Sequence, residues 1–230
     1  MSTPAEQLIL DLSLRPALGA EDFIVSASNE AALALIDSWP DWPSPVAVVA
    51  GPKGSGKTHL AQVFRHRSGA GVVSAHALDD DEARRLGEGR AAVVEDADRG
   101  ILSEKAFFHL INLAREQGGH ILVTGQTPPG QWSIALPDLR SRLRAAPVVQ
   151  ILPPDDALLR AVLVKLLSDR QLPATPHAVT HLARHMERSM EAALGLVEEI
   201  DRMLWQRPRE VSRDVAREAL QRIGGEGDGS

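Results

Sequence analysis

The segment that decides the fold is Gly51-Pro52-Lys53-Gly54-Ser55-Gly56-Lys57-Thr58, which fits the phosphate loop G-x-x-x-x-G-K-[ST] at every fixed position. A buried strand is predicted before it, at 46–50, and a helix after it, beginning at His59. Glycines let the backbone wrap closely round a polyphosphate, with N–H groups and the helix N-terminus facing its charge. Lys57 would reach the outer phosphates, and the Thr58 hydroxyl would complete a magnesium shell. A glycine-rich turn that binds nothing is the alternative, but strand, loop and helix in this order favour nucleotide binding.

The composition is ordinary for a globular protein and excludes several other classes. The 230 residues are 43% hydrophobic and 24% charged, with a net charge of −6 and no cysteine. The missing cysteines exclude disulfides and thiolate metal sites. No apolar run is long enough for a membrane span, and the N-terminus lacks the basic region of a signal peptide. We therefore expect a cytoplasmic protein that is a poor generic DNA binder, because such binding needs neutralised phosphates.

Patterning along the chain predicts an α/β core followed by a helical domain. Continuous apolar runs at 46–50, 72–75, 91–94, 120–124 and 148–152 alternate with helical segments such as Glu104–Gln117, which indicates a five-stranded parallel sheet. A helix with Ser28 as its N-cap precedes the first strand. The predicted parts are a leader at 1–20, a nucleotide-binding domain at 21–153, a small all-α lid at 154–223 and a disordered tail at 224–230.

Two carboxylates follow the third predicted strand, as in a Walker B motif. In Ala91-Ala-Val-Val-Glu95-Asp96, the first carboxylate would bind magnesium and the second, Asp96, would orient an attacking water. Most proteins of this class place aspartate where this chain has Glu95, whose extra methylene moves the oxygens. Thr124 ends the next strand and would lie between the two phosphate-site strands. An acidic strand end that faces solvent is the alternative for the carboxylates.

Three arginines alternate in Arg140-Ser141-Arg142-Leu143-Arg144, just before the fifth predicted strand. A guanidinium is always charged and bridges phosphate oxygens in a fork, so it can stabilise a transition state in a neighbouring subunit. A solvated basic stretch is the alternative reading of such a cluster. The pattern alone does not choose among the three arginines.

The order of these features resembles the AAA+ ATPases, and more narrowly the DnaA family of replication initiators and regulators. The blocks that carry the resemblance run across nearly the whole chain: Phe23-Ile-Val-Ser-Ala-Ser-Asn29, Gly51–Thr58, Val93-Val-Glu-Asp96, Leu122-Val-Thr-Gly125, Leu136-Pro-Asp-Leu-Arg-Ser-Arg142-Leu143 and Met186-Glu-Arg188-Ser-Met-Glu-Ala-Ala-Leu194. The resemblance implies an AAA+ P-loop core, with an adenine pocket around Phe23 and Ile24. It further implies that Arg142 is an arginine finger and that Arg188 is the lid arginine that contacts bound nucleotide.

Two features are similar to the Hda-type regulators, a branch of this family that inactivates DnaA. The sequence ends just after the predicted lid helices, so we expect no helix-turn-helix domain for reading origin DNA. In addition, Gln7-Leu8-Ile9-Leu10-Asp11-Leu12 looks like the peptide that docks on the sliding clamp, the β subunit of DNA polymerase III. Gln7 would hydrogen-bond at one end, while Leu8, Leu10 and Leu12 fill apolar pockets. Packing of these leucines on their own domain is the alternative.

The resemblance implies a bacterial regulator that binds ADP or ATP with Mg²⁺ and stimulates hydrolysis of DnaA-bound ATP. Its partners would be DnaA and the clamp, and it would contact DNA only indirectly, through the clamp. No membrane is expected as a partner, and whether the protein forms a homodimer is left undecided. The insert at 79–90 opens with four acidic residues, which phosphates would repel. An ATPase of the helicase-loader type and a catalytically silent DnaA-binding adaptor are the alternatives.

Three histidines recur every four residues at His177, His181 and His185, so they are expected on one helix face. This spacing occurs in metal sites. No cysteine accompanies them and the nearest carboxylate, Glu187, lies off that face. A surface or packing role is therefore favoured over metal binding.

Overall fold

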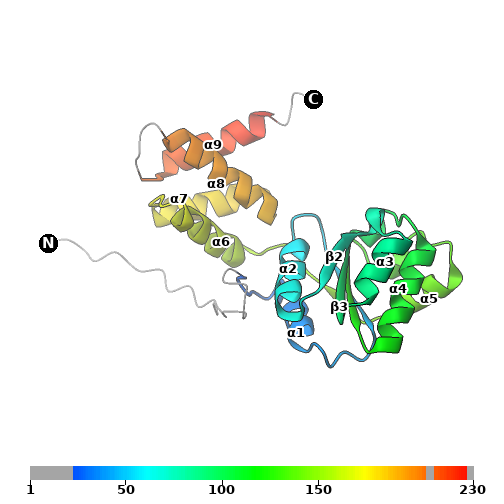
Figure 1. Cartoon of the computed structure of the whole chain (residues 1–230). Coiled ribbons are helices and arrows are strands. Elements are labelled where there is room, and N and C mark those ends of the chain that lie inside the picture. Colours follow the sequence, from blue (N-terminus) through cyan, green and yellow to red (C-terminus); the bar gives the residue numbers. More distant parts are fainter. Residues whose placement is uncertain (1–22, 206–209, 227–230) are drawn as a thin grey trace. The chain divides into compact units, whose positions relative to one another are not determined.

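The computed structural model describes residues 23–205 and 210–226 of the chain, which divide into two compact units that meet in sequence at Pro153 and Pro154. The first unit, the core domain, contains the elements α1 (Glu30–Asp37), β1 (Val46–Ala50), α2 (Lys57–Ser68), β2 (Gly71–Ser74), α3 (Asp80–Gly87), β3 (Ala91–Glu95), α4 (Glu104–Gln117), β4 (His120–Gly125), α5 (Pro137–Ala145) and β5 (Val148–Gln150). The second unit, the lid domain, contains α6 (Asp156–Asp169), α7 (Pro176–His185), α8 (Met190–Leu204) and α9 (Arg213–Glu226) (Figure 1).

The core domain is built on a five-stranded parallel sheet in the order β2-β3-β4-β1-β5, which confirms the predicted α/β class. Side chains of β1 alternate between the two faces: Val46 and Val48 join the cluster under α3, α4 and α5, whereas Ala47 and Val49 join the cluster under α1 and α2. The ribbon shows these helices on opposite faces of the sheet (Figure 1). Because both faces are covered, the strands are the continuous apolar runs of the sequence.

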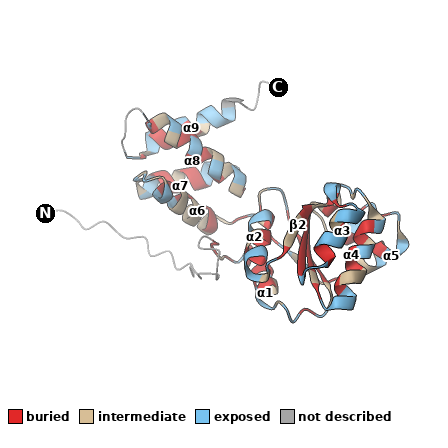
Figure 2. Ribbon diagram, viewed as in Figure 1, coloured by how far each residue is buried: buried red, intermediate tan, exposed pale blue. Residues whose placement is uncertain are grey.

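Large side chains fill both layers between sheet and helices. Phe107 of α4 is fully buried on one face and Phe64 of α2 on the other, where it stacks on Trp42 with ring centroids 5.2 Å apart. Figure 2 shows the buried residues as red patches on the strands and on the inner sides of the helices. Each such side chain stabilises the fold by about 1.5–3 kcal/mol. The sheet is therefore a firm base for the loops at its carboxyl edge.

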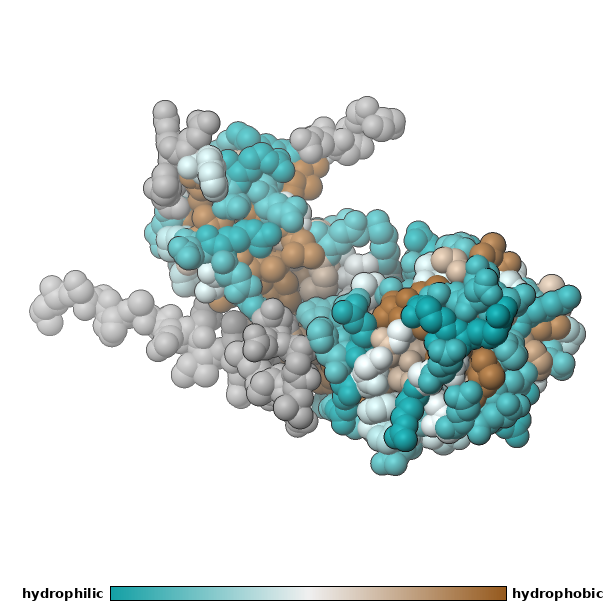
Figure 3. Space-filling model, in the orientation of Figure 1, coloured by the Kyte–Doolittle hydropathy of each residue, from teal (hydrophilic) through white to brown (hydrophobic). Residues whose placement is uncertain are grey.

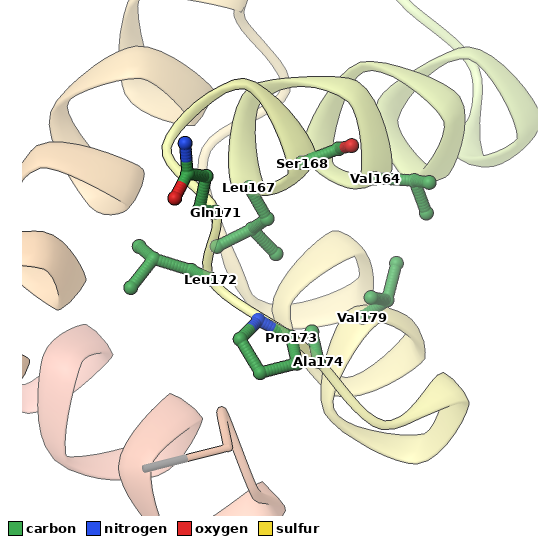
Figure 4. A pocket seen from close by; sticks show the side chains of 8 residues that line it. All are labelled: Val164, Leu167, Ser168, Gln171, Leu172, Pro173, Ala174 and Val179. Atoms are coloured by element: carbon green, nitrogen blue, oxygen red, sulfur yellow. The ribbon is translucent and has the colours of Figure 1, made fainter. Parts of the chain in front are cut away.

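The lid domain has its own apolar core, in which α7 packs against both α6 and α9. Asp155, Thr175 and Ser189 cap α6, α7 and α8, since each side chain accepts a hydrogen bond from a backbone N–H of the first turn. A mostly apolar hollow of about 400 Å³ lies where α6 leads into α7 (Figure 4). There Gln171 has a left-handed φ of 56° and the chain turns through Leu172 and Pro173.

Several predicted boundaries differ from the structure, most of them by one or two residues. Asn29, not Ser28, occupies the N-cap position of α1, because the Ser28 hydroxyl bonds to that of Ser26 instead. Strand β5 ends at Gln150, two residues before the predicted end. Helix α9 continues to Glu226, so residues 224–226 belong to a helix rather than to a disordered tail.

The surface carries both hydrophilic and hydrophobic residues. On the face drawn in Figure 3, hydrophilic areas cover much of both units and brown apolar areas interrupt them. Within the described ranges, no helix is long and apolar enough to cross a membrane.

Candidate nucleotide-binding site

The phosphate loop joins β1 to α2, and its glycines are required by the backbone path. Gly54 and Gly56 have φ of 71° and 96°, the left-handed region that other residues rarely adopt. A Cβ on Gly51 would lie 2.7 Å from the carbonyl oxygen of Ile151, so a side chain cannot fit there. The loop leads directly into the N-terminus of α2, and the N–H groups of a helix N-terminus attract anions.

Lys57, the first residue of α2, points back over the loop. Its Nζ donates to the carbonyl oxygens of Gly51 at 2.8 Å and Pro52 at 2.9 Å. Burial lowers the pKa of Lys57, while the carboxylates of Asp96 and Asp98 act in the opposite direction. The ammonium group thus lies in a partly desolvated site with carboxylates near it, where a phosphate oxygen would be strongly attracted.

Glu95 ends β3 and faces the same region. Burial raises the pKa of this carboxyl group, and a hydrogen bond with the Thr58 side chain opposes the rise. Its Oε1 atom is buried without a hydrogen-bond partner. An unpaired buried carboxylate oxygen beside a threonine hydroxyl is an oxygen donor set of the kind that Mg²⁺ prefers.

A hydrogen bond from a backbone N–H to a side chain links Asp96 to Thr124. Asp96 has a left-handed φ of 57°, and its N–H donates to the Thr124 hydroxyl at 3.2 Å. Thr124 is buried at the end of β4, which lies between β3 and β1 in the sheet. Strained backbone of this kind costs about 1–3 kcal/mol and is concentrated at functional sites. The hydrogen bond links the strand end that carries the carboxylates to the neighbouring strand.

Asp98 belongs to the same cluster, although the sequence analysis did not single it out. Its Oδ1 atom is buried without a hydrogen-bond partner and lies 3.1 Å from where a Cβ on Gly125 would be. Its charge also acts on Lys57. The only sequence signal was a third acidic residue two positions after Asp96, and such a residue is common on a solvated loop.

The donors fit a metal that is held together with phosphates rather than by protein alone. In the part of the chain that the structure describes, no three His, Asp or Glu side chains are placed to hold a metal ion. Mg²⁺ is commonly bound through one or two carboxylates plus substrate phosphates, which matches Glu95 with the Thr58 hydroxyl. The same finding bears on the spaced histidines of α7, which do not form a three-ligand site.

The residues expected around the base lie at the start of the described chain. Phe23 and Ile24 are both buried, and the Phe23 ring meets the His59 ring edge-on with centroids 5.2 Å apart. The Asn29 side chain holds this segment by donating to the carbonyl oxygen of Ile24 at 2.9 Å. An aromatic and an aliphatic side chain are thus fixed next to the first turn of α2.

The three arginines of α5 have different surroundings. Arg140 donates to the carbonyl oxygen of Ile134 at 3.2 Å, and Arg144 donates to that of Gly130 at 3.4 Å. The Arg142 guanidinium lies over the Phe108 ring, 4.9 Å from its centroid. Among the described residues it has no hydrogen-bond or ion-pair partner, so its donors remain available.

The other predicted residues belong to the lid domain, to the loop or to the part of the chain outside the described residues. Arg188 lies just before α8 of the lid and pairs with Asp156 of α6 at 2.7 Å. Lys53 of the loop is exposed. The predicted clamp-binding residues Gln7, Leu8, Leu10 and Leu12 lie outside the described residues.

The chain is similar to curated replication initiators named DnaA. No family model matches the chain. The replication initiator DnaA of Thermomicrobium roseum is 26% identical over 214 residues, which span 80% of this chain but only 46% of that protein. The chain thus spans about half the length of the curated relatives that it matches.

Solved structures agree on the fold. Domain III of DnaA from Thermotoga maritima superposes with a TM-score of 0.73 at 19% identity, over 90% of this chain and 97% of that one. A DnaA structure described as bound to AMPPCP and single-stranded DNA gives a TM-score of 0.69 at 18% identity, over 93% of this chain and 70% of that one. These likenesses confirm the expected AAA+ fold.

Proposed function

Because this chain is a DnaA-related AAA+ protein, we propose that it is a nucleotide-bound regulator that supplies Arg142 to the ATP site of a DnaA subunit. Hydrolysis would take place in that partner, and turnover at the chain's own site is expected to be weak. The single observation that carries the proposal is the Arg142 guanidinium, which rests on Phe108 with its donors unused.

The chain's own site would hold an adenine nucleotide as a ligand that sets conformation. Lys57 and the loop backbone would bind the phosphates, Phe23 and Ile24 would contact the base, and Glu95 with Thr58 would hold Mg²⁺. The metal would supply neutralisation of phosphate charge. A DnaA neighbour described as bound to AMPPCP supports an adenine nucleotide. We expect ADP, which would favour a conformation in which Arg142 is presented to the partner.

The arginine would act as a trans-supplied finger. A fork of N–H donors stabilises the charge that develops on the transferred phosphoryl group, and such a group raises the rate by orders of magnitude. The aromatic face of Phe108 holds the guanidinium without consuming those donors. Arg140 and Arg144 instead spend a donor on a backbone carbonyl, so they are less suited to this role.

The segment 7–12 would tether the protein to the sliding clamp. Tethering raises the local concentration of the regulator near replicated DNA, which would restrict DnaA inactivation to times when clamps are loaded. Substitution of both Gln7 and Leu10 by alanine should abolish binding to immobilised clamp. Retained affinity would refute this part of the proposal and leave the Arg142 part intact.

The test of the finger is ATP hydrolysis by DnaA with this protein, clamp and DNA present. Arg142→Ala should keep clamp binding and lose the stimulation, and Arg142→Lys should rescue little because lysine lacks the fork. Arg144→Ala is the matched control on the same helix and should keep the stimulation. Full stimulation by Arg142→Ala would favour a silent adaptor, and steady ATP turnover by the pure protein would favour a self-standing ATPase.

A further inference from the structure

A cationic hollow lies on the lid domain, far along the chain from the phosphate loop. It has a volume of about 260 Å³ and is lined by His177, Thr180, His181, Arg184, His185 and Arg213. The first five residues come from α7, and Arg213 is the first residue of α9, which packs closely against α7. Every lining side chain except that of Thr180 is an arginine or a histidine. We call this hollow the lid cation pocket.

No carboxylate balances the arginines of the lid cation pocket. Helix α7 contains no Asp or Glu, and none lines the pocket. Within the described ranges, neither Arg184 nor Arg213 has an ion pair or hydrogen-bond partner. The next arginine of α9, Arg217, instead pairs with Asp214 at 3.0 Å. The pocket therefore carries positive charge that the fold leaves uncompensated.

Arg213 lies in the first turn of α9, where the other charged residue is Asp214. The N-terminus of a helix carries a partial positive charge, which favours anions and disfavours cations in the first turn. Arg213 nevertheless begins the 14-residue helix α9. The Arg213 side chain lines the same pocket as Arg184 and the histidines of α7. An anion in the pocket would lie against arginines from both α7 and α9.

His181 responds to this charge. Burial lowers the pKa of His181, and the charges of His185, Arg213 and Arg217 lower it further. The α6 helix also packs against α7 but adds no residue to the pocket lining. The His185 Nδ1–H donates to the carbonyl oxygen of His181 at 2.8 Å, and the two rings have centroids 4.2 Å apart. The helix backbone thus holds the His185 ring, and the His181 ring lies against it.

We propose that the lid cation pocket binds a phosphate group, through Arg184 and Arg213 with His181 and His185 beside them. Arginine forks match phosphate oxygens, and imidazoles can donate to them as well. The group would come either from a free phosphate compound or from the backbone of a nucleic acid. This site is independent of the nucleotide site and of the function proposed for Arg142.

The first test follows the histidine ring signals of the full chain by NMR during pH titration, in inorganic phosphate and in chloride at equal ionic strength. Phosphate should raise the pKa of His181 relative to chloride, because a bound anion favours the imidazolium. His120 of β4 is the internal reference, since burial alone lowers its pKa. An unchanged pKa of His181, or an equal rise at His120, would overturn the proposal.

The second test compares two charge-matched variants. Arg213→Gln should weaken phosphate binding roughly tenfold, as expected for one lost charge-assisted contact. Arg115→Gln removes an equally exposed arginine from α4 and should leave the affinity unchanged. If both variants weakened phosphate binding equally, phosphate would be attracted only by the overall charge of the protein. That result would overturn the proposed site.

A third arm identifies the source of the phosphate. A short fluorescent single-stranded oligonucleotide and inorganic phosphate are titrated separately against the wild type and Arg213→Gln. Oligonucleotide binding that depends on Arg213 assigns the pocket to a nucleic-acid backbone, and it should weaken steeply with salt. Binding of inorganic phosphate alone assigns a free phosphate compound. Binding of a polyglutamate peptide with neither phosphate source would contradict the proposal.

Discussion

The phosphate loop and the lid cation pocket handle charge in opposite ways. At the loop, Lys57 has carboxylates on the neighbouring strand ends, which oppose the effect of burial on its pKa. In the lid, the charges acting on His181 are all positive and add to the effect of burial. Both places contain a helix N-terminus, that of α2 and that of α9. The core site therefore mixes a lysine with carboxylates, whereas the lid pocket is lined by arginines and histidines without a carboxylate.

This difference indicates what each place can bind. A cation beside buried carboxylates suits a phosphate that arrives together with a metal, because Glu95 and Thr58 offer oxygen ligands. A pocket with arginines and histidines alone suits a bare anion.

Lys57→Ala should lower the affinity for ADP by roughly 100-fold, because it removes charge-assisted contacts to phosphate. The affinity is measured by calorimetry or with a fluorescent ADP analogue. Lys105→Ala, on the exposed side of α4, is the matched control and should bind as the wild type does. Undiminished affinity in Lys57→Ala would show that Lys57 of the phosphate loop does not contribute to ADP binding.

Phe108→Ala should reduce the stimulation of DnaA hydrolysis a few-fold while Arg142 is still present. The ring gives a cation–π contact worth about 0.5–1 kcal/mol, and its loss would leave the guanidinium less well held. The readout is hydrolysis at saturating regulator, with nucleotide affinity as a control that should not change. A variant that stimulates fully would show that Phe108 does not position the arginine.

Glu95→Gln should raise thermal stability slightly at neutral pH. Burial raises the pKa of Glu95 in the folded state above its unfolded value, so the penalty for the charged form is absent below the unfolded pKa and complete above the folded pKa. The gain should therefore disappear as pH falls below about 4, near the ordinary pKa of glutamate. Equal melting temperatures for both proteins at neutral pH would contradict the assigned burial.

Added sodium chloride should raise the pKa of His181 by a few tenths of a unit and leave that of His120 nearly unchanged. Salt screens the arginines that act on His181, whereas only burial acts on His120. The two pKa values are read from ring signals in a single NMR titration. A parallel change of both would mean that the lid pocket holds no unbalanced charge.

Much of the core could be predicted from the sequence because its signals are local. The apolar runs predicted the strands of the sheet, since strands covered on both faces have no polar alternation. The spacing predicted α4 at Glu104–Gln117, and the structure has the same bounds. The predicted N-cap of α1 was wrong, because the Ser28 hydroxyl forms a hydrogen bond with the Ser26 hydroxyl instead. Only the folded turn shows that these two side chains meet.

Parts of the sites could not be predicted because they depend on contacts between segments. Asp98 looks like a loop residue until its buried oxygen is found beside Gly125 and its charge near Lys57. The three arginines of α5 are equivalent in the sequence, and only their contacts with Phe108 and with backbone carbonyls distinguish them. Such contacts join residues that are distant along the chain.

The sequence by itself determined the phosphate loop, the parallel sheet and the helical lid, because glycine conformations, strand patterns and helix periodicity are properties of neighbouring residues. Tertiary structure decided which charges meet. It placed carboxylates from β3 and its following turn around Lys57, and it placed Arg213 of α9 against the histidine face of α7. Charge interactions depend on distance and burial, and the fold alone sets both.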